Sequence, residues 1–238
     1  MLFDGIFTKE NLDAYLKELS KEYRRISGNK VSIEIILIGG ASILANYTFR
    51  GMTYDIDAII EASSSFKEAV NHVGDKFNLP NGWLNADFVK TDSYSPKLIL
   101  FSKYYKTFSN ILNVRIVSSE YLVAMKLMSG RQYKCDLSDV VGVILEQEQK
   151  GEPISLDDIK RATKELYGGF DKIPDISKKF IEKVYETDDL ESLYNSVRQS
   201  EKENRSLLIE FEKNYKNVLK EDNVNEVIQA LKNKKWPK

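Results

Sequence analysis

The feature that most constrains the fold is a run of mostly β-branched and aliphatic residues that ends in two glycines. Residues 31–38 have the length and composition of a buried strand, and Gly39 and Gly40 stop it with a turn. Glycine allows positive φ and lets a ligand approach the backbone closely. Ser42 then adds a hydroxyl beside the free N–H groups at the start of a helix, where anions bind. The segment therefore predicts a strand, a turn and a helix N-terminus that can hold a phosphate.

A second apolar strand follows, and it carries a pair of carboxylates. Residues 55–60 are Asp-Ile-Asp-Ala-Ile-Ile, and side chains two positions apart on a strand point to the same face. Asp55 and Asp57 therefore project together. Adjacent carboxylates repel unless they share cations, and Mg²⁺ held by carboxylates and substrate phosphates is the usual solution. The sequence predicts a Mg²⁺ or Mn²⁺ site at which Asp55 and Asp57 orient a triphosphate for in-line displacement.

Several pieces in one order resemble the polymerase-β-like nucleotidyltransferase superfamily. The first is Gly-Gly-x-Ser, followed by Asp-x-Asp with Arg-x-x-Thr before it. The others are Trp-Leu-Asn at 83–85, Ala-Met-Lys at 124–126 and an Arg-to-Asp segment at 131–139. The order of the pieces is more specific than any one of them, and it covers roughly the first two thirds of the chain. Within the superfamily, the chain resembles the AbiEii-type toxin and related small bacterial nucleotidyltransferase-like proteins.

The resemblance implies transfer of a nucleotide monophosphate from an NTP to an acceptor, with release of pyrophosphate. It further implies a toxin-like setting with a cognate antitoxin partner, and an RNA or protein acceptor such as tRNA. Arg50, Thr53 and Lys126 become secondary phosphate contacts, because they match the residues of the family pieces. A mixed α/β (α+β) fold of the nucleotidyltransferase type is implied as well.

The Arg-to-Asp segment has both a functional and a structural interpretation. The resemblance gives a site role to one of Asp136 and Asp139, through pairing with Arg131 or Lys126. As structural residues, Asp136 would cap the next helix and Asp139 would interact favourably with its dipole.

The superfamily normally supplies a third carboxylate from a later strand, and the sequence shows no clear one. Residues 109–117 are the candidate strand, and Asn113 is the polar residue expected to face the site. An amide neither accepts a proton nor neutralises Mg²⁺ as a carboxylate does. Asp87 and Asp92 are possible substitutes. Two other classes stay open: a catalytically inactive nucleotide-binding or interaction protein, which Asn113 favours, and a small-molecule, antibiotic-type nucleotidyltransferase.

Composition and charge exclude other classes of protein. The hydrophobic content of 42% and the charged content of 30% are those of a globular protein. A net charge of −1 creates no global attraction to nucleic acid, so any RNA contact must be local. Cys135 is the single cysteine, which excludes an intrachain disulfide and a cysteine-based zinc site. His72 is also single and is expected on the surface of a helix. The sequence has neither an 18-residue apolar run nor a leader pattern at residues 1–4, so we expect a cytoplasmic protein without membrane contact.

The chain is long enough for two modest domains, and its character changes at Gly151-Glu152-Pro153. Residues 1–150 are expected to form a nucleotidyltransferase-like catalytic domain with a mixed sheet of about five strands. Residues 151–238 are expected to form an α-helical domain. Within the first domain, the patterns predict helices at 8–26 and 65–77, and strands at 31–38, 55–60, 86–89, 97–104 and 109–117.

Overall fold

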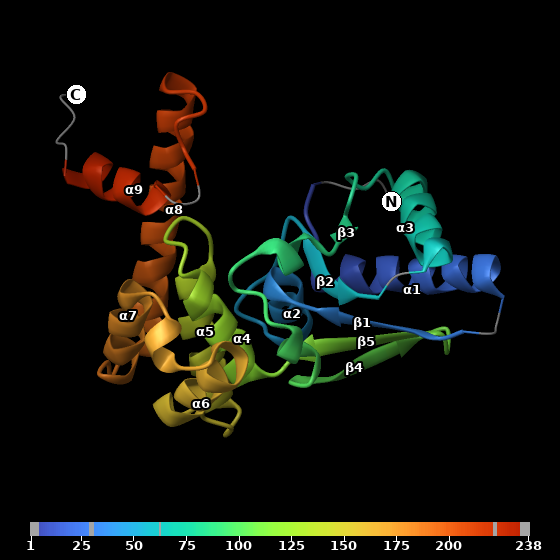
Figure 1. Cartoon of the computed structure of the whole chain (residues 1–238), viewed down its shortest axis with the longest axis horizontal. Helices are drawn as coiled ribbons and strands as arrows, with labels where there is room; N and C mark the ends of the chain where they lie inside the picture. Colours follow the sequence, from blue (N-terminus) through green and yellow to red (C-terminus); the bar gives the residue numbers. More distant parts are fainter. Residues whose placement is uncertain (1–4, 29–30, 62, 221–222, 234–238) are drawn as a thin grey trace. The chain divides into compact units, whose positions relative to one another are not determined.

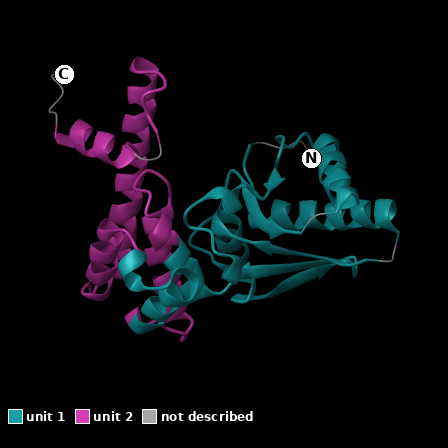
Figure 2. Cartoon of the chain, in the orientation of Figure 1, with its two compact units in different colours: residues 1–125, 157–172 teal, residues 126–156, 173–238 magenta. Residues whose placement is uncertain are grey.

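The described part of the chain forms two compact units (Figure 2). The computed structural model describes residues 5–28, 31–61, 63–220 and 223–233. Unit 1 comprises residues 1–125 and 157–172, and unit 2 comprises residues 126–156 and 173–238. The boundary expected after residue 150 therefore falls inside unit 2, because α5 (Asp136–Gln149) packs with α8 (Leu190–Asn214). Residues 1–4, on which the expected lack of a leader rests, lie outside the described part.

Unit 1 is built on a five-stranded sheet with the strand order β3-β2-β1-β5-β4 (Figure 1). β1 pairs antiparallel with β2 and parallel with β5, whereas β3 is parallel to β2 and β4 antiparallel to β5. The predicted mixed sheet of about five strands is confirmed. Its strands are β1 (Ile33–Leu37), β2 (Ile56–Ile60), β3 (Leu84–Asn85), β4 (Ser102–Phe108) and β5 (Leu112–Val117).

Two helices, α1 (Lys9–Ser27) and α3 (Ser64–Phe77), lie together over one side of the sheet (Figure 1). The side chains of alternate strand positions, including Ile35 and Leu37 of β1, join their apolar stripes in one core. The same alternation turns Ile36 of β1 toward the opposite face. Ile36 and Ile59 on that second face are buried as well, so the sheet has apolar packing on both sides.

Two segments expected as strands are 3-10 helices, η1 (Asp87–Lys90) and η2 (Pro96–Ile99). The prediction of a strand at 86–89 is wrong, because the N–H of Val89 bonds back to the carbonyl of Ala86 and makes a turn. The strand expected at 97–104 begins only at Ser102. Pro96 starts η2 and has no N–H with which to join a ladder of hydrogen bonds.

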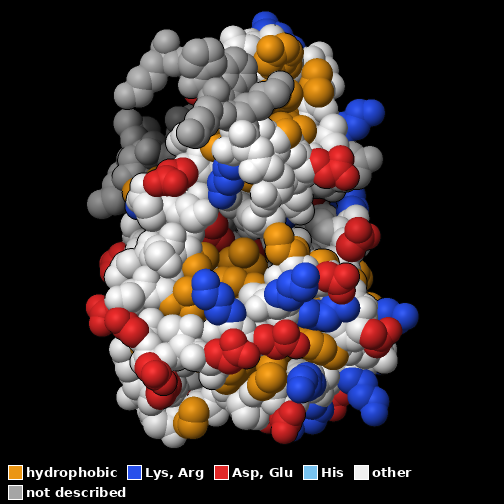
Figure 3. Space-filling model, turned by 90° about the vertical axis from the view of Figure 1, so that its left-hand side faces the viewer, with side chains coloured by type: hydrophobic (Ala, Val, Ile, Leu, Met, Phe, Trp, Pro, Cys, Tyr) orange, Lys and Arg blue, Asp and Glu red, His pale blue; other side chains and the backbone are white. Residues whose placement is uncertain are grey.

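The remaining helices confirm the expected helical character of the C-terminal part. In unit 2, Leu208 of α8 packs with Val224 and Ile228 of the last helix. The face seen in Figure 3 carries acidic and basic side chains side by side, as solvated helix surfaces do. Among the described helices, none is both long enough and apolar enough to cross a bilayer. Besides α5 and α8, the helices after β5 are α4 (Ser119–Ser129), α6 (Leu156–Tyr167), η3 (Phe170–Lys172), α7 (Asp175–Tyr185) and α9 (Val224–Asn233).

Candidate active site

The turn at the end of β1 opens the short helix α2 (Gly39–Asn46), as the sequence predicts. Gly39 has a φ of +54°, in the left-handed region that favours glycine. The cap residue Ile38 makes no side-chain hydrogen bond to the first turn of α2, and N–H groups at such a helix start can bind an anion. The N–H of Ile38 donates to the carbonyl of Asp57 over 3.0 Å, which fixes the turn beside β2. The glycine turn and the aspartate strand are therefore neighbours.

The two glycines bring charged side chains to the first turn of α2. A Cβ on Gly39 would lie 3.7 Å from Oδ2 of Asp57, so that carboxylate lies against the turn. A Cβ on Gly40 would lie 2.5 Å from Oγ1 of Thr53 and 2.9 Å from Nη2 of Arg50. Distances this short are not tolerated between real atoms. Because residue 40 is glycine, the Thr53 hydroxyl and the Arg50 guanidinium can lie directly beside the N-terminus of α2.

Arg50, Thr53 and Asp55 form a chain of hydrogen bonds beside this turn. Nη2 of Arg50 donates to Oγ1 of Thr53 over 3.4 Å, and Oγ1 of Thr53 donates to Oδ1 of Asp55 over 3.3 Å. Thr53 is buried, and its backbone exchanges two hydrogen bonds with buried Phe7, at 2.7 and 2.9 Å. The Arg-x-x-Thr piece therefore has a fixed backbone that orients one cation and one carboxylate.

Ser42 lies one turn into α2, and its side chain is fully buried. Its Oγ has no hydrogen-bond partner among the residues that the structure describes. An unsatisfied buried hydroxyl costs free energy, and a ligand oxygen is one partner that would satisfy it. The phosphate contact expected of Ser42 stays a prediction.

Asn85 is a candidate site residue to which the sequence analysis gave no role, although it belongs to the Trp-Leu-Asn piece. β3 pairs with β2 so that Asn85 stands directly opposite Asp57 and shares its face of the sheet. Trp83 of the same Trp-Leu-Asn piece is buried and donates its indole N–H to the carbonyl of Val70 over 3.0 Å. The piece thus combines a core anchor with an amide beside the aspartates. The only local signal was a polar residue directly after two large apolar ones.

The expected substitutes for a third carboxylate lie at the surface. Asp87 is exposed, and its carboxylate accepts a hydrogen bond from Lys90 over 2.6 Å. Its backbone N–H donates to Oδ1 of Asn85 over 2.9 Å, which places it next to the β3 edge of the site. Asp92 is exposed as well. A role for Asp87 or Asp92 stays a prediction.

Asn113 lies on β5, as expected, but at the other end of the sheet from Asp57. The N–H of Ile38, directly after the C-terminal end of β1, donates to the carbonyl of Asp57. Asn113 instead stands opposite Glu34, near the N-terminal end of β1. Four residues separate Glu34 from Ile38, or about 13 Å along a strand. The interpretation that Asn113 occupies the position of the general base is therefore wrong, because register, which sequence patterns do not reveal, places it elsewhere. Its Oδ1 instead accepts a hydrogen bond from Thr107 over 2.8 Å.

The donor set at the turn suits one hard cation. Asp55 and Asp57 carry the carboxylates here, whereas Asn85, in the row of Asp57, already uses its amide oxygen to accept the N–H of Asp87. Mg²⁺ is commonly held by one or two carboxylates together with substrate phosphates. Within the described residues, no group of three or more His, Cys, Asp and Glu side chains is arranged to hold an ion. Asp55 and Asp57 are therefore the residues that would hold Mg²⁺ or Mn²⁺, completed by phosphate oxygens.

Lys126, Arg131, Asp136 and Asp139 form a separate cluster inside unit 2. Nζ of Lys126 lies 2.8 Å from Asp136 and 2.9 Å from Asp139, and Nε of Arg131 lies 2.7 Å from Asp136. The pairing expected for these residues is confirmed. Burial tends to raise the pKa of Asp136, but the charges of Lys126 and Arg131 outweigh it and hold that pKa well below its usual range. A contact of Lys126 with nucleotide phosphate stays a prediction.

The start of α5 is capped from another helix. Asp136 was expected to cap it, but Cys135 is the cap residue, because the Asp136 carboxylate is directed to Lys126 and Arg131. Glu201 of α8 accepts the N–H of Leu137 over 2.9 Å and the hydroxyl of Ser138 over 2.5 Å. Burial raises the pKa of Glu201 to about 7, although the hydrogen bonds from Ser138 oppose it. Sequence reasoning missed Glu201, because its partners are distant in sequence.

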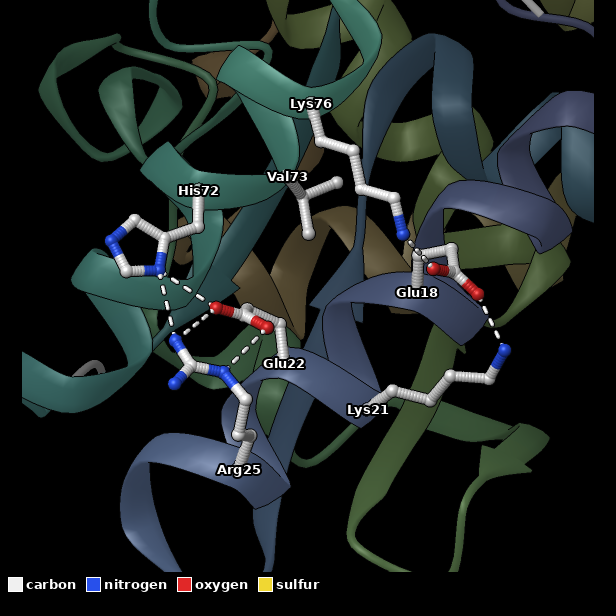
Figure 4. Close-up of a pocket in the computed structure, with 7 residues that line it drawn as sticks. All are labelled: Glu18, Lys21, Glu22, Arg25, His72, Val73 and Lys76. Atoms are coloured by element: carbon white, nitrogen blue, oxygen red, sulfur yellow. Dashed lines mark hydrogen bonds and ion pairs between the residues drawn. The ribbon is translucent and has the colours of Figure 1, made fainter.

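Unit 1 also contains two hollows of similar size, each of about 320 Å³. The first lies between α1 and α3 and is called the helix hollow (Figure 4). Glu22 contacts Arg25 and His72 there, each at 2.7 Å, while Glu18 contacts Lys21 at 2.5 Å and Lys76 at 2.7 Å. The expectation that His72 lies on a helix surface is confirmed. Each carboxylate of the helix hollow is thus held between two basic groups.

The second hollow, called the sheet-face groove, has a different lining. Its charged lining residues are Glu34 and Glu61, and its apolar ones are Ile99 and the buried residues Ile33, Ile36 and Ile59. Among the described residues, neither glutamate makes an ion pair. The groove lies on the second face of the sheet, since Ile59 is two residues from Asp57 on β2.

The fold is a mixed α/β one in which the glycine turn and the strand with Asp57 are neighbours. Residues 14–160 match the model of a family described as nucleotidyltransferase of unknown function (DUF6036). The match covers more than half of the chain, and the protein belongs to this family. No curated protein and no solved structure matches the chain significantly. The narrower resemblance to the AbiEii-type branch stays a prediction.

Proposed function

We propose that the protein is a Mg²⁺- or Mn²⁺-dependent enzyme that transfers a nucleotide monophosphate from an NTP to an acceptor hydroxyl. The observation that carries the proposal is the meeting of opposite charges at the first turn of α2. The Asp57 carboxylate lies against Gly39, and the Arg50 guanidinium lies against Gly40. A triphosphate with its cation requires both signs of charge in one place, together with free N–H groups.

The described residues would divide the work as follows. Arg50 and the first N–H groups of α2 would neutralise the phosphate oxygens, and Thr53 would hold both Arg50 and Asp55 in position. Bound at Asp55 and Asp57, the cation supplies charge neutralisation during the displacement. The acceptor oxygen forms a bond to the α-phosphorus, and the bond from that phosphorus to the β-bridging oxygen breaks. Pyrophosphate leaves with the electron pair, and the hydroxyl proton passes to water.

A second candidate function is nucleotide binding without transfer. It is favoured by the third donor beside Asp57, which is the amide of Asn85 rather than a carboxylate. An amide cannot accept the proton of an attacking hydroxyl, and general-base catalysis typically contributes about 10²–10⁴-fold to a rate. Such a protein would bind the NTP and its cation but transfer nothing.

The acceptor and the biological setting are finer parts of the proposal. The resemblance to the AbiEii-type branch supports RNA, such as tRNA, or a protein as acceptor, with an antitoxin as partner. Incubation with each α-labelled NTP, Mg²⁺ and total tRNA tests the acceptor directly. Label in RNA or in protein would support this part, whereas label in neither would contradict it.

Calorimetric titration with each NTP tests the nucleotide site. We expect at least one NTP to bind in Mg²⁺ or Mn²⁺ and to lose that binding in EDTA, because the aspartate pair repels the triphosphate when no cation neutralises it. Asp57→Asn should weaken binding more than about 100-fold, since even residues that only support a metal ligand contribute about 10–100-fold. Asp75→Asn, which changes an exposed aspartate on α3 of the same unit, is the matched control. Equal binding with and without EDTA would overturn the proposal.

A further inference from the structure

We infer that the outer edge of β4 is a docking site for an extended, acidic segment of a partner protein, which adds a sixth strand to the sheet. The docked segment alternates acidic and apolar side chains. The inference goes beyond the proposed function and does not depend on it. Three strand spacings, or about 14 Å, separate β4 from β2, which carries Asp57.

The backbone of β4 is open on one side. β4 is the last strand in the sheet order, and with seven residues it is the longest of the described strands. It pairs with β5 alone, and Figure 1 shows no helix or strand beyond it on its outer side. Within the described part of the chain, no residue outside β5 bonds to the backbone of residues 103–107. An edge of this kind is a template for a further strand.

The charge around β4 differs from that of the whole chain. Acidic residues number 36 of 238, and the net charge is −1. Residues 93–119, which include β4 and β5, contain no acidic residue at all. Their four basic residues are Lys97, Lys103, Lys106 and Arg115. The outer part of the sheet is thus positively charged, which favours a negatively charged partner.

One of these cations is left for a partner. Lys106 lies 2.8 Å from the carboxylate of Asp13, and both Lys97 and Arg115 donate to backbone carbonyls. Lys103 is exposed and makes neither an ion pair nor a side-chain hydrogen bond with any residue that the structure describes. An acidic side chain on an added strand would therefore meet a cation that has no competing partner in the fold.

The register of β4 assigns its side chains to two faces. Lys103 stands opposite Ile116 of β5, and Tyr104 stands opposite Arg115, so these two side chains point to opposite faces of the sheet. The Tyr104 side chain is 64% exposed, and Leu100, just before the strand, is 75% exposed. A partner strand with acidic residues on one face and apolar residues on the other would match Lys103 and Tyr104 together. In such a complex, main-chain hydrogen bonds give affinity and alternate side chains give specificity.

The same features argue against two other occupants. A second copy of the chain, paired through its own β4, would bring the lysines of both copies to one seam, and like charges on neighbouring strands destabilise a sheet. An RNA strand offers phosphate oxygens, which accept hydrogen bonds but cannot satisfy the outward carbonyls of β4. A peptide strand supplies both donors and acceptors.

Fluorescence anisotropy with a dye-labelled peptide of three Glu-Val repeats tests the docking site on the full-length chain. We expect this peptide to bind, and a peptide of three Lys-Val repeats not to bind. The Glu-Val peptide methylated at its backbone nitrogens should bind at least tenfold more weakly, because it cannot donate main-chain hydrogen bonds.

A charge reversal on the protein tests the role of Lys103. Lys103→Glu should weaken binding of the Glu-Val peptide about threefold or more, because an opposite-charge pair across strands becomes a like-charge pair. The matched control is Lys67→Glu on α3, which reverses another exposed lysine without an ion pair among the described residues and should leave binding unchanged.

Amide hydrogen exchange with the peptide bound locates the contact, and we expect slower exchange within residues 102–108. Absence of binding would overturn the inference and leave the lysines as protection of the edge against unwanted pairing. Equal binding of the methylated peptide, no effect of Lys103→Glu, or protection confined to other elements would also overturn it. Displacement of the peptide by an RNA oligonucleotide would show a general polyanion site instead, and slower exchange of β4 on self-association would show a second copy as the occupant.

Discussion

The helix hollow and the sheet-face groove have nearly the same volume and the same number of glutamates, yet their electrostatics differ. In the helix hollow, Glu18 and Glu22 are each held between basic groups (Figure 4). In the groove, Glu34 and Glu61 lie opposite each other over isoleucines, and none of the described cations pairs with them. A carboxylate whose partners are already present stabilises the fold. An exposed one without a partner is solvated by water and contributes little to stability.

The largest effect on NTP binding is expected from a substitution at Gly40, where a side chain would clash with its neighbours. Gly40→Ala would place a methyl group 2.5 Å from Oγ1 of Thr53, a buried residue whose backbone is hydrogen-bonded to Phe7. We expect loss of NTP binding and a fall of about 1–3 kcal/mol in the free energy of unfolding, typical of overpacking. Gly51→Ala is the matched control, since nothing lies within 4 Å of its Cβ position. Unchanged binding in Gly40→Ala would show that Arg50 and Thr53 do not form the site.

The next largest effect on NTP binding is expected to differ between substitutions at the two ends of the sheet. Asn85→Asp adds a third carboxylate in the row of Asp57, whereas Asn113→Asp adds one in the row of Glu34. We expect Asn85→Asp to strengthen Mg²⁺-dependent NTP binding by about tenfold, in line with the effect of groups that support a metal ligand. Asn113→Asp should not change it. A gain in Asn113→Asp instead would show that the register argument is wrong.

These two substitutions also show what sequence alone could reveal. The strand, the glycine turn and the aspartate pair were predictable, because each depends on residues close together along the chain. Asn85 was not, because its place beside Asp57 depends on the pairing of a two-residue strand. Phe88 and Val89 suggested a strand by apolarity alone, although a 3-10 turn forms there. The cap that Glu201 provides for α5 and the pair of glutamates in the groove likewise depend on contacts across the fold.

Glutamine substitutions should change stability in opposite directions in the two hollows. In the groove, Glu34→Gln with Glu61→Gln removes a like-charged pair and should raise the free energy of unfolding by about 0.2–1 kcal/mol. In the helix hollow, Glu18→Gln with Glu22→Gln removes surface ion pairs and should lower it by about as much. Thermal unfolding resolves both changes, since 1 kcal/mol shifts the midpoint by roughly 2–4 °C at this chain length. A change in the free energy of unfolding of the same sign in both hollows would contradict this difference between them.

The smallest effect is a dependence of stability on acid. Hydrogen bonds from Arg25 and His72 lower the pKa of Glu22 from 4.5 to about 2. A lowered pKa means that its contribution is fully present above pH 4.5 and is lost as the pH falls toward 2. Because Glu22 is largely solvated, we expect this contribution to be under about 1 kcal/mol. Urea unfolding of wild type and Glu22→Gln at pH 3 and pH 6 measures it, and an equal difference at both pH values would contradict the assignment.

Transfer of label from an α-labelled NTP tests the central claim most directly. Wild type, Asp57→Asn and Glu22→Gln are incubated with Mg²⁺ and total tRNA, and both pyrophosphate and labelled acceptor are measured. The account predicts transfer by wild type and by Glu22→Gln, and a loss of more than about 100-fold in Asp57→Asn. Equal transfer by Asp57→Asn, or binding of the NTP by wild type without transfer to any acceptor, would contradict it.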